Sequence, residues 1–129
     1  MGPQLADQRV HAIVPTPDVE RLRRFYEDVL GLAPEAERPA AVFYRVGAGT
    51  RFALSRSGGR ASGTHTQMAF MVPDLRAQVA ELRRRGVTFE EYETPKTDDG
   101  IARLPAGQTA WFKDPDGNVI GLIQLEDPI

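Results

Sequence analysis

The sequence predicts an α+β fold made of two tandem β-α-β-β-β modules, which form a curved mixed sheet around a cavity. An apolar strand, a Pro-Asp pair, an amphipathic helix and a glycine follow one another twice along the 129-residue chain. Each occurrence is followed by two apolar runs that a turn signal separates. We therefore expect one domain over residues 1–129, with modules at about 9–56 and 65–125.

The first module begins with the apolar stretch 9–15, which predicts a half-buried strand. A helix is expected to begin after Asp18, a good N-cap residue, and to end at Gly31. Residues 33–40 are expected to form a loop. The runs 41–46 and 51–56, on either side of a glycine-containing turn, predict a hairpin.

The second module repeats this order, with a helix from Asp74 to Gly86 and a closing hairpin. Residues 87–93 predict a strand. The segment 93–108 is long for a connection and is typical of a lid or binding loop, although 101–104 could form an extra strand. The closing hairpin is expected to have strands at 109–113 and 118–124. A flexible Gly/Ser-rich connection is expected at 55–64, between the two modules.

Strand alternation predicts which side chains line the cavity. If Ala12 and Val14 pack under the first helix, His11 and Ile13 point inward. The repeat places Gln67, Ala69 and Met71 inward as well. It places the intervening residues against the helix, namely Met68, Phe70 and Val72.

Composition excludes several classes of protein. The chain has no cysteine, so disulfides, thiolate metal sites and a cysteine nucleophile are excluded. A net charge of −2, with acids and bases interspersed, gives no electrostatic footprint for nucleic acid. No run approaches the ~20 apolar residues of a membrane span, and no signal peptide is visible, so a cytoplasmic location without membrane partners is expected.

The cavity is expected to be apolar and partly aromatic. Phe52 and Trp111 are the candidate wall residues, and His11 and Gln67 are candidates for orienting a ligand by hydrogen bonds. Glu91 could reach inward from its strand, although plain surface charge is the alternative. These residues favour a small hydrophobic or aromatic molecule as the binding partner.

Two stretches, HAIVPTPDVERLRRFYEDVLGL and WFKDPDGNVIGLIQ, resemble the vicinal oxygen chelate superfamily, the glyoxalase/bleomycin resistance protein/dioxygenase family. The resemblance extends from about residue 9 to 125. It implies a homodimer and a divalent metal held by equivalent strands of the two modules. The matching positions are His11, Gln67 and Gly121, and at the last of these the family usually has a glutamate.

One imidazole and one amide fall short of the three protein ligands of a usual catalytic zinc. We therefore expect a small-molecule-binding protein that lacks the usual metal site and needs no cofactor. The alternative is a lyase, isomerase or dioxygenase that uses zinc, nickel, manganese or iron, held by His11 with Gln67, His65 or a displaced glutamate. A metal-free enzyme with His11 as general base is a third possibility. Gly121 either lets an organic ligand reach deeper or serves packing.

Overall fold

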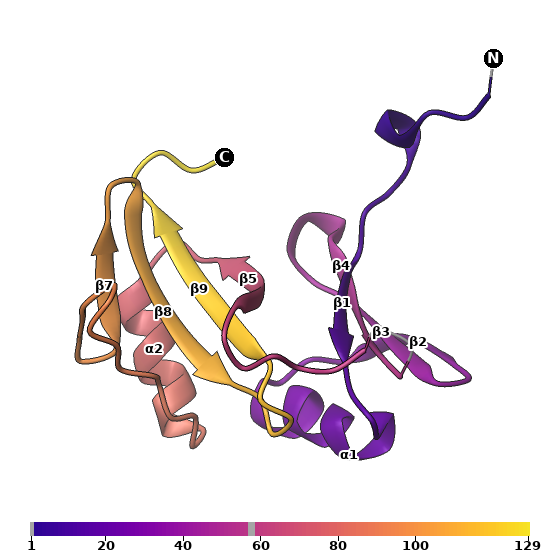
Figure 1. The fold of residues 1–129 in the computed structure, drawn as a ribbon, viewed down its shortest axis with the longest axis horizontal. Coiled ribbons are helices and arrows are strands. Elements are labelled where there is room, and N and C mark those ends of the chain that lie inside the picture. The colour runs from indigo at the N-terminus through magenta and orange to yellow at the C-terminus, as the bar shows by residue number, and fades with distance from the viewer. Residues whose placement is uncertain (1, 57–58) are drawn as a thin grey trace.

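A computed structural model describes residues 2–56 and 59–129 and confirms the α+β fold (Figure 1). Two mixed sheets stand side by side as two lobes, and neither closes on itself. Two residues of the Gly/Ser-rich connection, 57 and 58, lie outside the described residues. Within the described residues, no helix is long and apolar enough to cross a membrane.

Each sheet combines one parallel pair of strands with antiparallel pairs. The first sheet has the order β1 (Ala12–Pro15), β4 (Arg51–Ser55), β3 (Ala41–Arg45) and β2 (Pro34–Arg38). The second has the order β5 (Thr66–Met71), β9 (Val119–Leu125), β8 (Gly107–Lys113), β7 (Ile101–Leu104) and β6 (Thr97–Asp98). In both sheets the strand that precedes the helix pairs in parallel with the last strand of the module.

The helices begin where their capping residues predict. Asp18 accepts a hydrogen bond from the Arg21 amide before α1 (Val19–Arg24), and Asp74 accepts one from the Ala77 amide before α2 (Leu75–Arg84), both at 3.1 Å. α1 continues into the π-helical turn η2 (Phe25–Val29). Gly31 and Gly86 follow the two helices with φ of 78° and 92°, which glycine adopts without strain. Two short 3₁₀ turns complete the elements, η1 (Leu5–Asp7) and η3 (Gly47–Gly49).

Two element predictions are wrong. Residues 34–38 form the edge strand β2 and not a loop; proline and exposed charges are compatible with an edge, where only one side of the strand is paired. Residues 87–93 form no continuous strand; Phe89 bridges to Phe112 of β8, and Glu93 forms a separate bridge to Lys96. The Glu91 carboxylate binds the following turn and so fixes this segment as a loop.

The two modules share one interior. The buried clusters under α1 and α2 are both contacted by the same four side chains, Phe25, Leu30, Met68 and Phe70. Met68 and Phe70 lie on the helix side of β5, as strand alternation predicts. Because these side chains bury apolar area against both clusters, the packing of one module depends on the other.

A polar cluster at the last hairpin turn also joins the modules. The Tyr26 hydroxyl donates to Asp114 Oδ2 at 2.8 Å, and Asn118 Nδ2 donates to the Pro15 carbonyl at 3.0 Å; both bonds are buried. At the margin, Asp116 accepts hydrogen bonds from the Thr16 hydroxyl at 2.6 Å and from Arg21. We call the turn 114–118, together with its partners Pro15, Thr16, Arg21 and Tyr26, the clasp.

Candidate ligand-binding site

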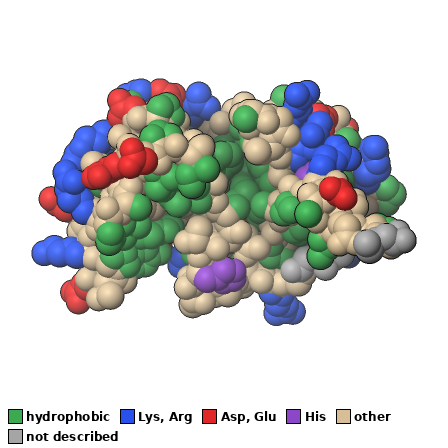
Figure 2. All heavy atoms as spheres, turned by 90° about the horizontal axis from the view of Figure 1, so that it is seen from above, with side chains coloured by type: hydrophobic (Ala, Val, Ile, Leu, Met, Phe, Trp, Pro, Cys, Tyr) green, Lys and Arg blue, Asp and Glu red, His purple; other side chains and the backbone are tan. Residues whose placement is uncertain are grey.

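The side of the sheets away from the helices forms a concave face. Ile13 and Met71 lie there with 41% and 62% of their surface exposed, and Trp111 of β8 is half-buried on the same face. Seen from above Figure 1, apolar side chains gather in the hollow between the two lobes, and charged side chains lie mainly toward the outer margins (Figure 2). An apolar hollow with a charged margin is typical of a surface that binds small organic molecules.

A pocket of about 400 Å³ opens on this face beside β5, β8 and β9. Trp111 and Tyr92 form an aromatic pair in its wall, with ring centroids 5.5 Å apart and planes at 70°. The indole Nε1 donates to the Thr66 hydroxyl at 3.1 Å, which fixes the orientation of the ring. His65, Pro95 and Val119 also line this concave-face pocket.

Gly121 lies directly beneath this aromatic wall. A Cβ atom at Gly121 would lie 3.3 Å from both Ala69 Cβ and Thr66 Cγ2, and 3.6 Å from Trp111 Cδ1. Trp111 and Gly121 are also register partners in the β8–β9 hairpin. The glycine therefore serves packing, because its missing side chain lets the indole lie close to the sheet.

The two polar residues that were expected to orient a ligand, His11 and Gln67, have different surroundings. His11 is half-buried just before β1, edge-on to Phe43 with centroids 6.1 Å apart. Gln67 lies at a register irregularity of β5, and its Nε2 donates to the Ile13 carbonyl at 2.9 Å. The amide thus joins the edges of β5 and β1, so it holds the two sheets together at the floor of the hollow.

The positions implied by the family do not fit its divalent metal. They offer one imidazole, an amide whose nitrogen is engaged, and Gly121, which has no ligand atom. In residues 2–56 and 59–129, no group of three His, Cys, Asp or Glu side chains is placed to hold a metal ion. His65, the alternative ligand, precedes β5, contacts Ser62 Oγ through Nδ1 and lines the concave-face pocket.

Phe52 is not a wall of the cavity. Its side chain is 2% exposed and faces α1, where it stacks on Tyr44 with centroids 5.1 Å apart. Its register partner in β1 is Ala12, which also packs on the helix side. The sequence alone does not fix the register of β1 against β4, so it gave no signal that places Phe52 on the helix side.

Glu91 also has a local structural role. Its carboxylate accepts hydrogen bonds from the Thr97 hydroxyl at 2.6 Å and from the Gly100 amide at 3.0 Å. These bonds lower the pKa of the Glu91 carboxyl below its ordinary value, and the bond from Thr97 has the largest effect. The neighbouring Tyr92 lines the pocket instead. A regular strand with Glu91 inward would turn Tyr92 away from the cavity, so the sequence did not point to this residue.

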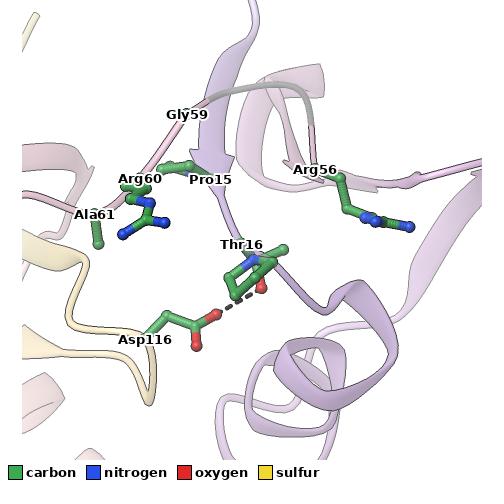
Figure 3. Close-up of a pocket in the computed structure, with 8 residues that line it drawn as sticks. Pro15, Thr16, Arg56, Gly59, Arg60, Ala61 and Asp116 are labelled. Atoms are coloured by element: carbon green, nitrogen blue, oxygen red, sulfur yellow. Dashed lines mark hydrogen bonds between the residues drawn. The ribbon is translucent and has the colours of Figure 1, made fainter.

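A second, polar hollow lies beside the clasp, with a volume of about 540 Å³ (Figure 3). Thr16 and Asp116 line it and are bonded to each other. Arg60 lies near Asp116, whereas Arg56 points away from it. Since Asp116 also pairs with Arg21, this hollow belongs to the junction of the modules. Of the lining residues that the structure describes, none is aromatic.

Comparison with known proteins places this geometry in context. The model of the Glyoxalase/Bleomycin resistance protein/Dioxygenase superfamily matches residues 8–122. No curated protein matches the chain.

Several solved structures are similar over most of their length. TnmS3, an antibiotic binding protein from Streptomyces sp. CB03234, is 30% identical, with a TM-score of 0.67 over 93% of this chain and 98% of that one. A glyoxalase/bleomycin resistance protein from the same organism is 31% identical, with a TM-score of 0.64 and coverages of 89% and 100%. A superfamily member from Sphaerobacter thermophilus DSM 20745 is 27% identical, with a TM-score of 0.72 and coverages of 93% and 99%.

Proposed function

We propose that this chain, which belongs to the Glyoxalase/Bleomycin resistance protein/Dioxygenase superfamily, binds a small hydrophobic or aromatic molecule on its concave face without chemical conversion. The observation that carries the proposal is the concave-face pocket with its Trp111–Tyr92 wall. Large rigid rings supply contact area at little cost in side-chain entropy, and offset or edge contacts between rings favour a planar ligand.

The hydrogen-bonding groups at the pocket margin suit a neutral ligand with a few polar substituents. Thr64, Thr94 and His65 line the pocket, and none of the described residues places a carboxylate or a guanidinium in its lining. A ligand that is mainly aromatic would bury its rings against Trp111 and keep its polar substituents at the margin. The similar antibiotic binding protein TnmS3 supports the same class of function.

We further propose that binding needs no metal. The Gln67 amide nitrogen is engaged by the Ile13 carbonyl, and Gly121 contributes no ligand atom. His11 remains as a single imidazole beside Phe43. A role for His11 in orienting a ligand through a hydrogen bond is compatible with this position.

Fluorescence of Trp111, the single tryptophan, tests the proposal directly. The protein is titrated with bleomycin and a panel of planar aromatic antibiotics, with and without a chelator. We expect saturable quenching by at least one aromatic compound, with the same Kd in both conditions. In calorimetry, Trp111→Ala should weaken binding of that compound at least tenfold, whereas Leu104→Ala, on the exposed part of β7, should leave it unchanged.

Metal titration of the chelator-treated protein provides the opposing test. Stoichiometric binding of zinc, nickel, manganese or iron that is lost in His11→Ala would contradict the proposal. It would instead favour a metal-dependent lyase, isomerase or dioxygenase. Absence of saturable quenching across the whole panel would also contradict it.

A further inference from the structure

A third pocket lies on the helix side of the second sheet and extends to Met71, at the end of the edge strand β5. It has a volume of about 310 Å³ and is lined by Phe112 and Leu122. These residues alternate in sequence with Trp111 and Gly121, so they point to the helix side. Leu30, just after η2, and Leu82 of α2 are also among its lining residues. We call this space the helix-side pocket.

The helix-side pocket is a gap that the apolar side chains around it do not fill. Leu30, Phe70 and Val72 all pack against the core, yet all three remain partly exposed. Protein interiors are normally close-packed, and an apolar cavity of about 150 Å³ is already large enough to bind benzene. A space of 310 Å³ between walls from both modules can therefore hold a compact molecule.

The lining defines the chemistry of that molecule. Nine of the ten lining side chains are apolar, and the tenth is the amide of Gln78. Within residues 2–56 and 59–129, the Gln78 side chain makes no hydrogen bond, so it is free to meet one polar group. A charged ligand would lose its hydration without gaining an opposite charge.

We propose that the helix-side pocket is a second ligand site, for a compact uncharged molecule that carries one hydrogen-bonding group, such as an alkylphenol. The apolar part of the ligand contacts Leu30, Leu82 and Leu122, and its hydroxyl meets the Gln78 amide. Because the sheet separates this pocket from the Trp111–Tyr92 wall, binding here does not depend on the proposed concave-face function.

Methyl NMR with 4-methylphenol, toluene and 4-methylbenzoate tests the site. We expect saturable shifts of the Leu30, Leu82 and Leu122 methyl signals with 4-methylphenol, and at least tenfold weaker binding of 4-methylbenzoate. Gln78→Leu should weaken 4-methylphenol about fivefold and leave toluene unchanged. Leu32→Trp, which places an indole at the pocket wall, should abolish the shifts, whereas Leu104→Trp on β7 should not.

Three results would overturn this proposal. The first is the absence of saturable shifts at these methyl groups up to the solubility limit of 4-methylphenol. The second is a set of shifts confined to concave-face residues such as Ile13 and Ile123. The third is sedimentation showing a dimer that Leu32→Trp dissociates, because a second copy of the chain would then cover the pocket.

Discussion

At the scale of single residues, Asp114 connects the two modules most closely. Its carboxylate is buried and accepts bonds from the Tyr26 hydroxyl, the Asn118 side chain and the amides of Asp116 and Asn118. Burial raises the pKa of Asp114 above its ordinary value, although these bonds oppose the rise. Burial also raises the pKa of Tyr26, with the Asp114 charge adding to the effect.

Removal of this carboxylate should therefore be costly. Asp114→Ala leaves the buried Tyr26 hydroxyl and Asn118 amide without their acceptor, and an unsatisfied buried group costs about 1–3 kcal/mol. We expect the free energy of unfolding to fall by about 3 kcal/mol in urea denaturation. Asp28→Ala, at an exposed carboxylate of η2, is the control and should change it by less than about 0.5 kcal/mol. Equal effects of the two substitutions would show that the clasp does not stabilise the fold.

Because the pKa of Asp114 is raised, the stability of the folded protein should depend on pH in a predictable direction. The folded state binds this proton more tightly than the unfolded state, whose pKa is about 3.9, so the contribution of the group to stability rises as pH falls. Relative to Asp114→Asn, the wild-type protein should gain stability between pH 7 and pH 4.5, as measured in urea. Surface carboxylates are common to both proteins and cancel in the comparison. A difference that stays constant or shrinks toward acid would contradict the assignment.

Residue positions were predictable where strand alternation was regular. Val14, Met68 and Phe70 face the helices as expected. Gln67 was expected inward as a ligand-orienting residue, and its amide donates to the Ile13 carbonyl beside a register irregularity between Thr66 and Met68; such an irregularity has no signature in the sequence.

At the scale of elements, the hairpin of β8 and β9 supports the candidate site, because it holds both Trp111 and Gly121. It begins at Gly107, opposite Leu125. A Cβ atom at Gly107 would lie 2.0 Å from the Gln124 carbonyl oxygen, so the two backbones approach each other too closely for any side chain.

Gly107→Ala should therefore strain the start of this hairpin. Because the clash is with backbone, which cannot move aside cheaply, we expect a loss of about 2 kcal/mol in the free energy of unfolding. Gly47→Ala is the matched control, since nothing lies within 4 Å of the corresponding Cβ position in η3. Thermal unfolding of both variants checks this expectation, and an unchanged Gly107→Ala protein would refute it.

The elements themselves were predictable to different degrees. Asp18 with Gly31, and Asp74 with Gly86, mark both helices because caps and stops depend on local chemistry. β2 was missed because an edge strand needs little apolar patterning. Residues 87–93 were misread because their path depends on Glu91 binding a turn nine residues further along.

At the scale of the whole molecule, the shared interior and the clasp make the modules interdependent. Phe70 packs against both buried clusters, and Tyr26 of the first module bonds to Asp114 of the second. Sequence repetition predicted two modules. It could not predict these contacts between them, because they depend on how the lobes meet in space.

We expect a single cooperative unfolding transition as a result. In urea, NMR signals of Val14 in the first module and of the Trp111 indole in the second should disappear with the same midpoint. Phe70→Ala should lower both midpoints together, since it removes packing from both clusters. Two separated transitions would show that the modules fold independently.

We also propose a homodimer in which each chain keeps its own two modules. The family resemblance implies a homodimer, and the clasp bonds between the two modules can be satisfied within a single chain. Sedimentation should give the mass of two chains. Isotope-labelled and unlabelled protein should form mixed dimers on simple mixing. A monomer, or mixed dimers that form only after denaturation, would contradict the proposal.

The clasp also sets the order of events during synthesis. Tyr26 and Asp114 are 88 residues apart, and Pro15 and Asn118 are 103 apart. At about 5–20 residues per second, Tyr26 leaves the peptidyl-transferase centre roughly 4–18 s before its partner exists. Until then the Tyr26 hydroxyl of the first module has no partner, and Phe25 is not covered by the second module. The growing chain is then open to chaperones and proteases until the turn that holds Asp114 and Asn118 has been synthesised.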